Sequence, residues 1–135
     1  MRSKFFPTLF FFGSKTKKQA NQKPQRALTY IKATYPRSRF EETFELFWQW
    51  LFYQHHDLSK PDLFARLLRE HAGYTATEVE AIMAAANDKK WKDALLSRTQ
   101  EALDRGAFGA PWFWVVREDA DGKEEDSAMF FGSDR

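Results

Sequence analysis

Most of the hydrophobic pattern is helical. Over Gln25–Arg105, apolar residues recur with the period of about 3.6 that is typical of amphipathic helices. Pro24 and Pro36 bracket a first predicted helix, because proline marks helix boundaries. A last helix is expected over Asp88–Arg105, with Trp91, Leu95, Ala102 and Leu103 facing inward. Gly106 then stands where a left-handed residue would end it.

Residue patterns that are typical of helix N-termini divide this stretch into several helices. SRFE at Ser38–Glu41 and TATE at Thr75–Glu78 both predict a capping box, in which a hydroxyl and a glutamate each bond to the other's backbone N–H. SKPD at residues 59–62 is a further start signal. The helix that opens at Ser38 carries a stripe broad enough to be buried on most sides. Its members are Phe40, Phe44, Phe47, Trp48, Leu51 and Phe52.

After Gly106 the hydrophobic period falls to about 2, which is typical of strands. WFWVVRE, from Trp112, predicts a strand, DADGK predicts a turn, and SAMFF, ending at Phe131, predicts a second strand. Residues 112–116 are apolar on both faces, as in a strand with neighbours and with cover on both sides. Because the chain supplies one clear partner strand, we expect this hairpin to belong to a larger sheet.

The charge is unevenly distributed. Residues 1–40 carry ten Lys and Arg and no acid, whereas the net charge of the whole chain is only +2. A basic, acid-poor start is typical of a flexible end or of a targeting segment. An arm that binds nucleic acid is the remaining alternative.

The composition excludes several kinds of site. The 135 residues suffice for one domain of ordinary size, and no apolar run is long enough for a membrane span. The absence of cysteine excludes disulfides, thiolate metal sites and a cysteine nucleophile in this chain. His55 and His56 are consecutive and do not share a helix face, so we expect no metal site here.

GAFGAP at Gly106–Pro111, followed about twenty residues later by FGSDR at Gly132 and its neighbours, resembles the kappa-class glutathione S-transferases. These are DsbA-like members of the thioredoxin superfamily. QRALTYIKATYP, from Gln25, and the stretch from FWQWLF to VEAIM are similar to the helical insertion of that family.

The resemblance implies an α/β, thioredoxin-like fold with a large helical insertion. The present chain is expected to be mostly helical, with a C-terminal β-hairpin, and to lack the N-terminal βαβ half. The implied organisation is a basic arm over residues 1–24, the helical insertion over residues 25–105 and a partial thioredoxin-like domain over residues 106–135. The last part would contain the cis-proline strand, a second strand and the start of a final helix.

The resemblance also implies an enzyme that uses glutathione as co-substrate, with a small electrophile or a peroxide as its second substrate. It implies a homodimer and an intracellular location, in the mitochondrion or the peroxisome if not the cytoplasm. We expect no nucleic-acid partner. One alternative is a glutathione-dependent 2-hydroxychromene-2-carboxylate isomerase, although those enzymes tend to have Gln where this chain has Ser133. The other is a non-catalytic helical interaction module.

Four residues are candidate glutathione-binding residues by resemblance. In the family, a cis peptide bond at the proline that matches Pro111 turns the backbone of the preceding residue, here Ala110, towards the cysteinyl unit of glutathione. Ser133 would bind the γ-glutamyl carboxylate and Asp134 the ammonium group. Without the family, Pro111 is an ordinary trans proline at the start of a strand, Ser133 a helix cap and Asp134 a first-turn acid. No catalytic residue is assigned, because the sequence around Ser14 does not match the catalytic turn of the family.

Overall fold

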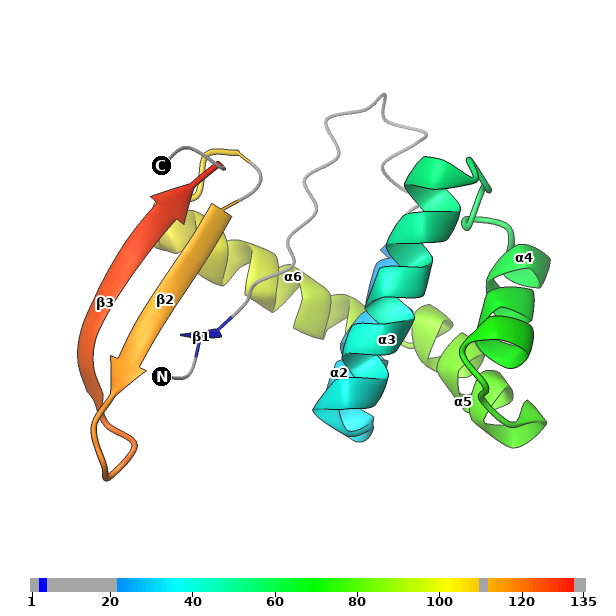
Figure 1. Ribbon diagram of the computed structural model, residues 1–135, viewed down its shortest axis with the longest axis horizontal. Coiled ribbons are helices and arrows are strands. Elements are labelled where there is room, and N and C mark those ends of the chain that lie inside the picture. Colours follow the sequence, from blue (N-terminus) through cyan, green and yellow to red (C-terminus); the bar gives the residue numbers. More distant parts are fainter. Residues whose placement is uncertain (1–2, 5–21, 110–111, 133–135) are drawn as a thin grey trace. The chain divides into compact units, whose positions relative to one another are not determined.

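The chain divides into two units. The computed structural model describes residues 3–4, 22–109 and 112–132. One unit comprises Gly13–Leu95, and the other comprises Met1–Phe12 together with Leu96–Arg135. The first is helical and the second carries the sheet (Figure 1). No helix in the described ranges is long and apolar enough to cross a membrane.

The predicted helices are present, and two of them end in a wider π-helical turn, labelled η. In chain order the elements are α2 (Gln22–Thr34), α3 (Arg37–Trp48), η1 (Gln49–Tyr53), α4 (Pro61–Arg66), η2 (Leu67–His71), α5 (Ala76–Asn87) and α6 (Lys89–Asp104).

Of the two predicted capping boxes, one is confirmed and one is wrong. At the start of α5, the N–H of Glu78 donates to Oγ1 of Thr75, and the N–H of Thr75 donates to Oε2 of Glu78. At the start of α3 the N-cap is Pro36, and no side chain caps the helix. Ser38 already lies in the first turn, because the extended conformation fixed by Pro36 lets the helix begin at Arg37.

The start of α2 also differs from the prediction. The helix begins at Gln22, and Pro24 lies inside its first turn instead of preceding it. Proline is tolerated there because the first N–H groups of a helix have no acceptor within the helix. The ring of Pro24 is buried, which gives this position a packing role as well.

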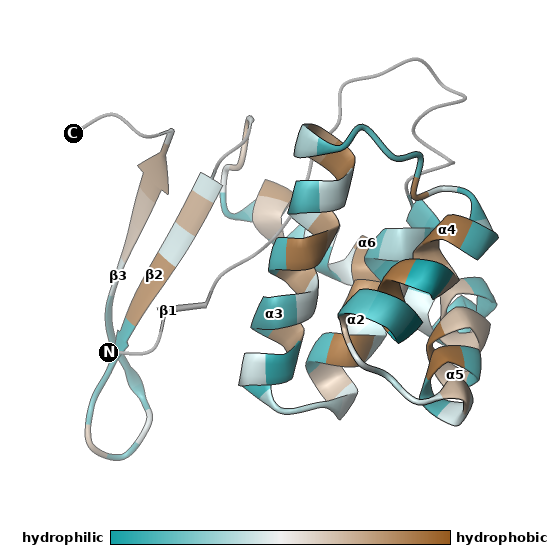
Figure 2. Ribbon diagram, turned by 45° about the vertical axis from the view of Figure 1, so that its right-hand side comes forward, coloured by the Kyte–Doolittle hydropathy of each residue, from teal (hydrophilic) through white to brown (hydrophobic). Residues whose placement is uncertain are grey.

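The core of the helical unit is built from one face of each helix. Helices α2 and α5 make its most extensive helix–helix contact. Figure 2 shows hydrophobic and hydrophilic residues alternating along each of these helices, as expected for helices that bury one face. The residues buried in this core are Ala27, Leu28, Ile31, Phe40, Phe47, Trp50, Leu58, Phe64, Leu67, Leu68, Tyr74, Ile82 and Ala86.

The aromatic stripe of α3 and η1 is less buried than its sequence predicts. Phe47 is buried, but Phe44 and Trp48 are half-buried and Phe52 is 39% exposed. Phe44 meets Trp48 edge to face at 5.9 Å between ring centroids, and Trp48 stacks on Phe52 at 4.5 Å. These rings therefore form a ladder along the helix surface, because residues four apart lie above one another.

The sheet has the order β1-β2-β3 and is antiparallel throughout. Strand β2 (Trp112–Glu118) pairs along its length with β3 (Glu124–Phe131), which confirms the predicted hairpin. The short β1 (Ser3–Lys4) pairs with the other edge of β2, a partner that the sequence did not indicate.

The hairpin turn is organised by one carboxylate. Oδ1 of Asp119 accepts hydrogen bonds from the N–H groups of Asp121 and Lys123, and the N–H of Asp119 donates to the carbonyl of Lys123. This is the local side-chain bonding that favours aspartate in turns. A bulge between Arg117 and Glu118 ends the regular part of the ladder beside this turn.

Candidate functional site

The four residues predicted to bind glutathione, Ala110, Pro111, Ser133 and Asp134, lie outside the described residues. The structure therefore describes the candidate site through its immediate neighbours in the chain. These neighbours are Gly109, Trp112, Phe131 and Gly132.

The neighbours of the two motifs meet at one end of the sheet. Trp112, the first residue after the GAFGAP motif, is the register partner of Phe131 at the start of FGSDR. In an antiparallel pair, residues directly opposite each other have Cα atoms about 4.5–5.5 Å apart. Two motifs that are separated by about twenty residues in the sequence therefore adjoin the same end of the hairpin.

Hydrogen bonds at the C-terminus of α6 fix the direction in which the chain continues towards the start of β2. The N–H of Ala107 donates to the carbonyl of Ala102, and the N–H of Gly106 donates to the carbonyl of Leu103, each at 2.9 Å. This is a Schellman motif, and Gly106 takes the left-handed φ of +91° predicted for it. Ala102 and Ala107 are both buried, which completes the motif with its apolar contact. Leu103, predicted to face inward, is 46% exposed and was assigned to the wrong face.

Gly109 lies against the last strand. A Cβ at this position would come within 3.0 Å of Cε2 of Phe131, so only glycine fits without movement. The near neighbour of Gly109 in the structure is thus the ring of Phe131. The ring of Phe108 also contacts Phe131, with centroids 4.5 Å apart.

A comparison with models of known families decides which family the chain belongs to. The model of the DSBA-like thioredoxin domain matches residues 8–135, which is most of the chain.

The chain belongs to the DSBA-like thioredoxin domain family.

This membership confirms the thioredoxin-like, DsbA-like fold predicted from the two motifs. The family includes thiol oxidoreductases and glutathione-dependent enzymes, and its domain suggests chemistry of that general type. No curated protein matches the sequence.

In this DsbA-like chain, two tryptophans lie on one face of β2, next to the end of the hairpin where Trp112 pairs with Phe131. Trp112 and Trp114 have ring centroids 6.0 Å apart at an interplanar angle of 22°. The guanidinium of Arg105 lies 4.7 Å from the ring centroid of Trp114, within the range of a cation–π contact. Sequence analysis missed this contact, because nothing in the local pattern singles out Arg105.

Arg105 is in turn held by an acid. It donates to Glu101 at 3.2 Å, and Arg98 donates to the other oxygen of the same carboxyl at 2.8 Å. Burial disfavours the charged form of Glu101, but the hydrogen bonds from Arg98 and Arg105 outweigh it and lower its pKa. The carboxylate thus stays ionised and keeps Arg105 over the Trp114 ring.

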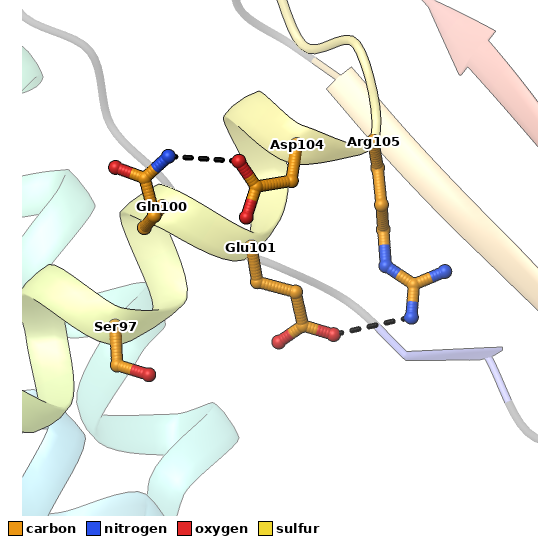
Figure 3. A pocket seen from close by; sticks show the side chains of 5 residues that line it. All are labelled: Ser97, Gln100, Glu101, Asp104 and Arg105. Carbon is orange, nitrogen blue, oxygen red and sulfur yellow. Dashed lines mark hydrogen bonds and ion pairs between the residues drawn. The ribbon is translucent and has the colours of Figure 1, made fainter.

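An open polar hollow lies along the same helix end. It is lined by Ser97, Gln100, Glu101, Asp104 and Arg105, and Figure 3 shows its two interactions, from Gln100 to Asp104 and from Arg105 to Glu101. Its charged groups all have partners among the lining residues, and none of the predicted site residues lines it. We therefore assign no chemistry to it.

Two of the three histidines contact a buried aromatic ring, and the third lies just beyond a helix end. The rings of His56 and His71 lie 4.7 and 4.9 Å from that of the buried Trp50. His55 takes a left-handed φ of 56° beyond the end of η1. In the part of the chain that the structure describes, no three His, Cys, Asp or Glu side chains are grouped so as to hold a metal ion.

Proposed function

We propose that this DsbA-like protein is a glutathione-dependent transferase or thiol oxidoreductase of the kappa glutathione S-transferase class. Glutathione would bind at Ala110 and Pro111 and at Ser133 and Asp134. The second substrate would be a small electrophile or a peroxide.

One observation carries the proposal. Trp112 and Phe131 are paired; Trp112 directly follows one of the two motifs that resemble the glutathione-binding motifs of the kappa class, and Phe131 is the first residue of the other. A tripeptide such as glutathione is short, so its cysteinyl and γ-glutamyl groups can reach both motifs only if the motifs adjoin one place. The Schellman motif at Gly106 and the contact of Gly109 with Phe131 support the same geometry from the other side of the loop.

The proposed contacts follow from the chemistry of the tripeptide. A backbone N–H and C=O pair at Ala110 would bond to the cysteinyl unit as one strand bonds to another. Ser133 would donate to the γ-glutamyl carboxylate. The carboxylate of Asp134 would accept from the ammonium group, in a charge-assisted hydrogen bond.

In the kappa class the thiolate of bound glutathione is the reacting group. A lowered thiol pKa raises the fraction of thiolate, which is the nucleophile. No residue of this sequence is assigned to that activation. The proposal for this chain therefore rests on the binding of glutathione, and binding is what the test measures.

The test is calorimetric titration of the full chain with glutathione and with Cys-Gly, which lacks the γ-glutamyl group. We expect saturable binding of glutathione and much weaker binding of Cys-Gly. Asp134→Asn should weaken glutathione binding by roughly 10–100-fold, the equivalent of about 1.5–3 kcal/mol for a hydrogen bond to a charged group.

The matched control is Asp126→Asn, which removes the same charge from an exposed position on β3. It should leave the affinity unchanged. If folded wild-type protein binds no glutathione, or if both variants weaken binding equally, the proposal is wrong. A folded chain that does not bind glutathione would favour the non-catalytic helical interaction module.

A further inference from the structure

Strand β3 has an unusual outer edge. It is the last strand in the described sheet order β1-β2-β3, so one of its edges has no neighbouring strand in that sheet (Figure 1). All of its eight residues except Ser127 are exposed. A long exposed strand edge is a template for pairing with another chain.

The usual protections of such an edge are confined to the hairpin end of β3. The bulged residue Glu125 and the three acids Glu124, Glu125 and Asp126 are all at that end, and the strand contains no lysine and no proline. Its C-terminal half is apolar and exposed, with Met129 at 45%, Phe130 at 55% and Phe131 at 42%. In Figure 2 the hydrophilic colour is confined to the hairpin end of the strand.

We infer that β3 pairs with β3 of a second copy of this chain, antiparallel and centred on Met129. This inference does not depend on glutathione binding. It assigns a surface and an orientation to the association of two chains.

The charge distribution selects the antiparallel orientation. The acids Glu124, Glu125 and Asp126 are all at one end of the strand, and the remaining five residues are uncharged. A parallel pair would place the acids of the two copies opposite one another, and like charges directly opposite are destabilising. An antiparallel pair places them at opposite ends.

The same charges and the side-chain sizes also determine which residue lies at the centre of the antiparallel pairing. Centred on Met129, the pairing joins all five uncharged residues with one another, Phe130 opposite Ala128 and Phe131 opposite Ser127 of the second copy. Each phenylalanine then lies opposite a small residue, and Met129 lies opposite Met129 of the second copy. Centred on Ala128 instead, the pairing would place Glu125 opposite Phe131 and Asp126 opposite Phe130.

The size of the contact sets the expected strength. Five paired residues per chain cover less than the roughly 1,600 Å² of a standard protein interface. The dimer should therefore dissociate on dilution, and association should be followed over a wide range of protein concentration.

The first test is sedimentation of the full chain. We expect a reversible monomer–dimer equilibrium that Met129→Lys weakens about tenfold or more, because two lysines would then meet at the centre of the pair. Ala120→Lys adds the same charge in the exposed hairpin turn and should leave the equilibrium unchanged. A wild-type chain that stays monomeric at every concentration would overturn the inference, as would equal effects of both variants.

The second test determines the register of the two β3 strands by cross-linking. It does not need a variant that blocks the pairing. The natural chain has no cysteine, so a single introduced cysteine is a unique site. Met129→Cys should give cross-linked dimers with a short thiol-reactive linker, because the two positions face each other. Glu124→Cys should not, because ten residues of strand, about 33 Å, would separate the two sites. Cross-linking through position 124 would contradict the antiparallel register.

Discussion

The contact between Gly109 and Phe131 allows a quantitative test of the candidate site. A Cβ at position 109 would lie 3.0 Å from Cε2 and 3.4 Å from Cζ of Phe131. Carbon atoms pack best at about 3.5–4.0 Å. Gly109→Ala therefore forces either the loop or the ring to move by several tenths of an ångström.

The magnitude follows from two opposing effects. Overpacking typically costs about 1–3 kcal/mol, and the lower end applies here because Phe131 is 42% exposed and can yield. Alanine also restricts the unfolded chain, which stabilises the folded state by about 0.4–1 kcal/mol. Gly109→Ala should thus be mildly destabilising in the natural chain. In a Phe131→Ala background the same change should be stabilising.

The assay is hydrogen exchange of the β2 and β3 amides in the natural chain, the two single variants and the double variant. It reports the free energy of opening of the hairpin itself. The coupling energy between positions 109 and 131 should be about 1 kcal/mol.

Gly106→Ala is the control for backbone strain. No heavy atom lies within 4 Å of a Cβ built there, so its cost comes from the positive φ alone, about 1–2 kcal/mol. That cost should be the same whether position 131 is Phe or Ala. If instead the effects of Gly109→Ala and Phe131→Ala add to within about 0.3 kcal/mol, the ring does not contact Gly109 and the geometry given for the candidate site is refuted.

Two further predictions concern the helices. Thr75→Ala should destabilise the helical unit by about 1 kcal/mol in urea unfolding, since Glu78 loses its reciprocal partner in the capping box, and an unchanged midpoint would contradict that role. Because the folded-state pKa of Glu101 is lowered below its ordinary 4.5, its ion pairs with Arg98 and Arg105 should stabilise the chain above that pH and lose their effect as the pH falls through the lowered value. Glu101→Gln should therefore be less stable than the natural chain at neutral pH and equally stable in acid, and a difference that persists in acid would refute the assignment.

Local signals in the sequence predicted most of the elements. The Thr75 box, the left-handed residue at Gly106 and the turn before β3 each depend on residues within a few positions of one another. Such signals are readable because the interacting groups are neighbours in the chain. The DsbA-like thioredoxin fold was predicted from two short motifs, and the match to the DSBA-like thioredoxin domain over residues 8–135 confirms it.

Where a local signal failed, a competing one was stronger. Ser38 has the pattern of a capping residue, but the conformation at Pro36 starts α3 before Ser38 is reached. Phe52 has the spacing of a buried residue, but the π-helical turn η1 adds a residue to the last turn and changes which side chains face the core.

Contacts between distant segments could not be predicted. The pairing of Ser3 with Val115, the contact of Gly109 with Phe131 and the position of Arg105 over Trp114 join residues by tertiary packing. The residue types at these positions are compatible with many other neighbours. Glycine at position 109 indicates that something lies close, but its identity comes only from the folded chain.

The central claim, glutathione binding at the end of the hairpin, is tested most directly by the tryptophan side chains. The chain has five tryptophans, and two of them, Trp112 and Trp114, lie on β2 beside the candidate site. Their indole N–H signals in a nitrogen–proton NMR spectrum can be assigned with single Trp→Phe variants.

On titration with glutathione, the Trp112 signal should shift and saturate, with a smaller shift at Trp114. The signals of the other three tryptophans, in the helical unit, should stay in place. If all five signals remain unchanged, or if only the signals of the helical unit move, glutathione does not bind at the end of the hairpin.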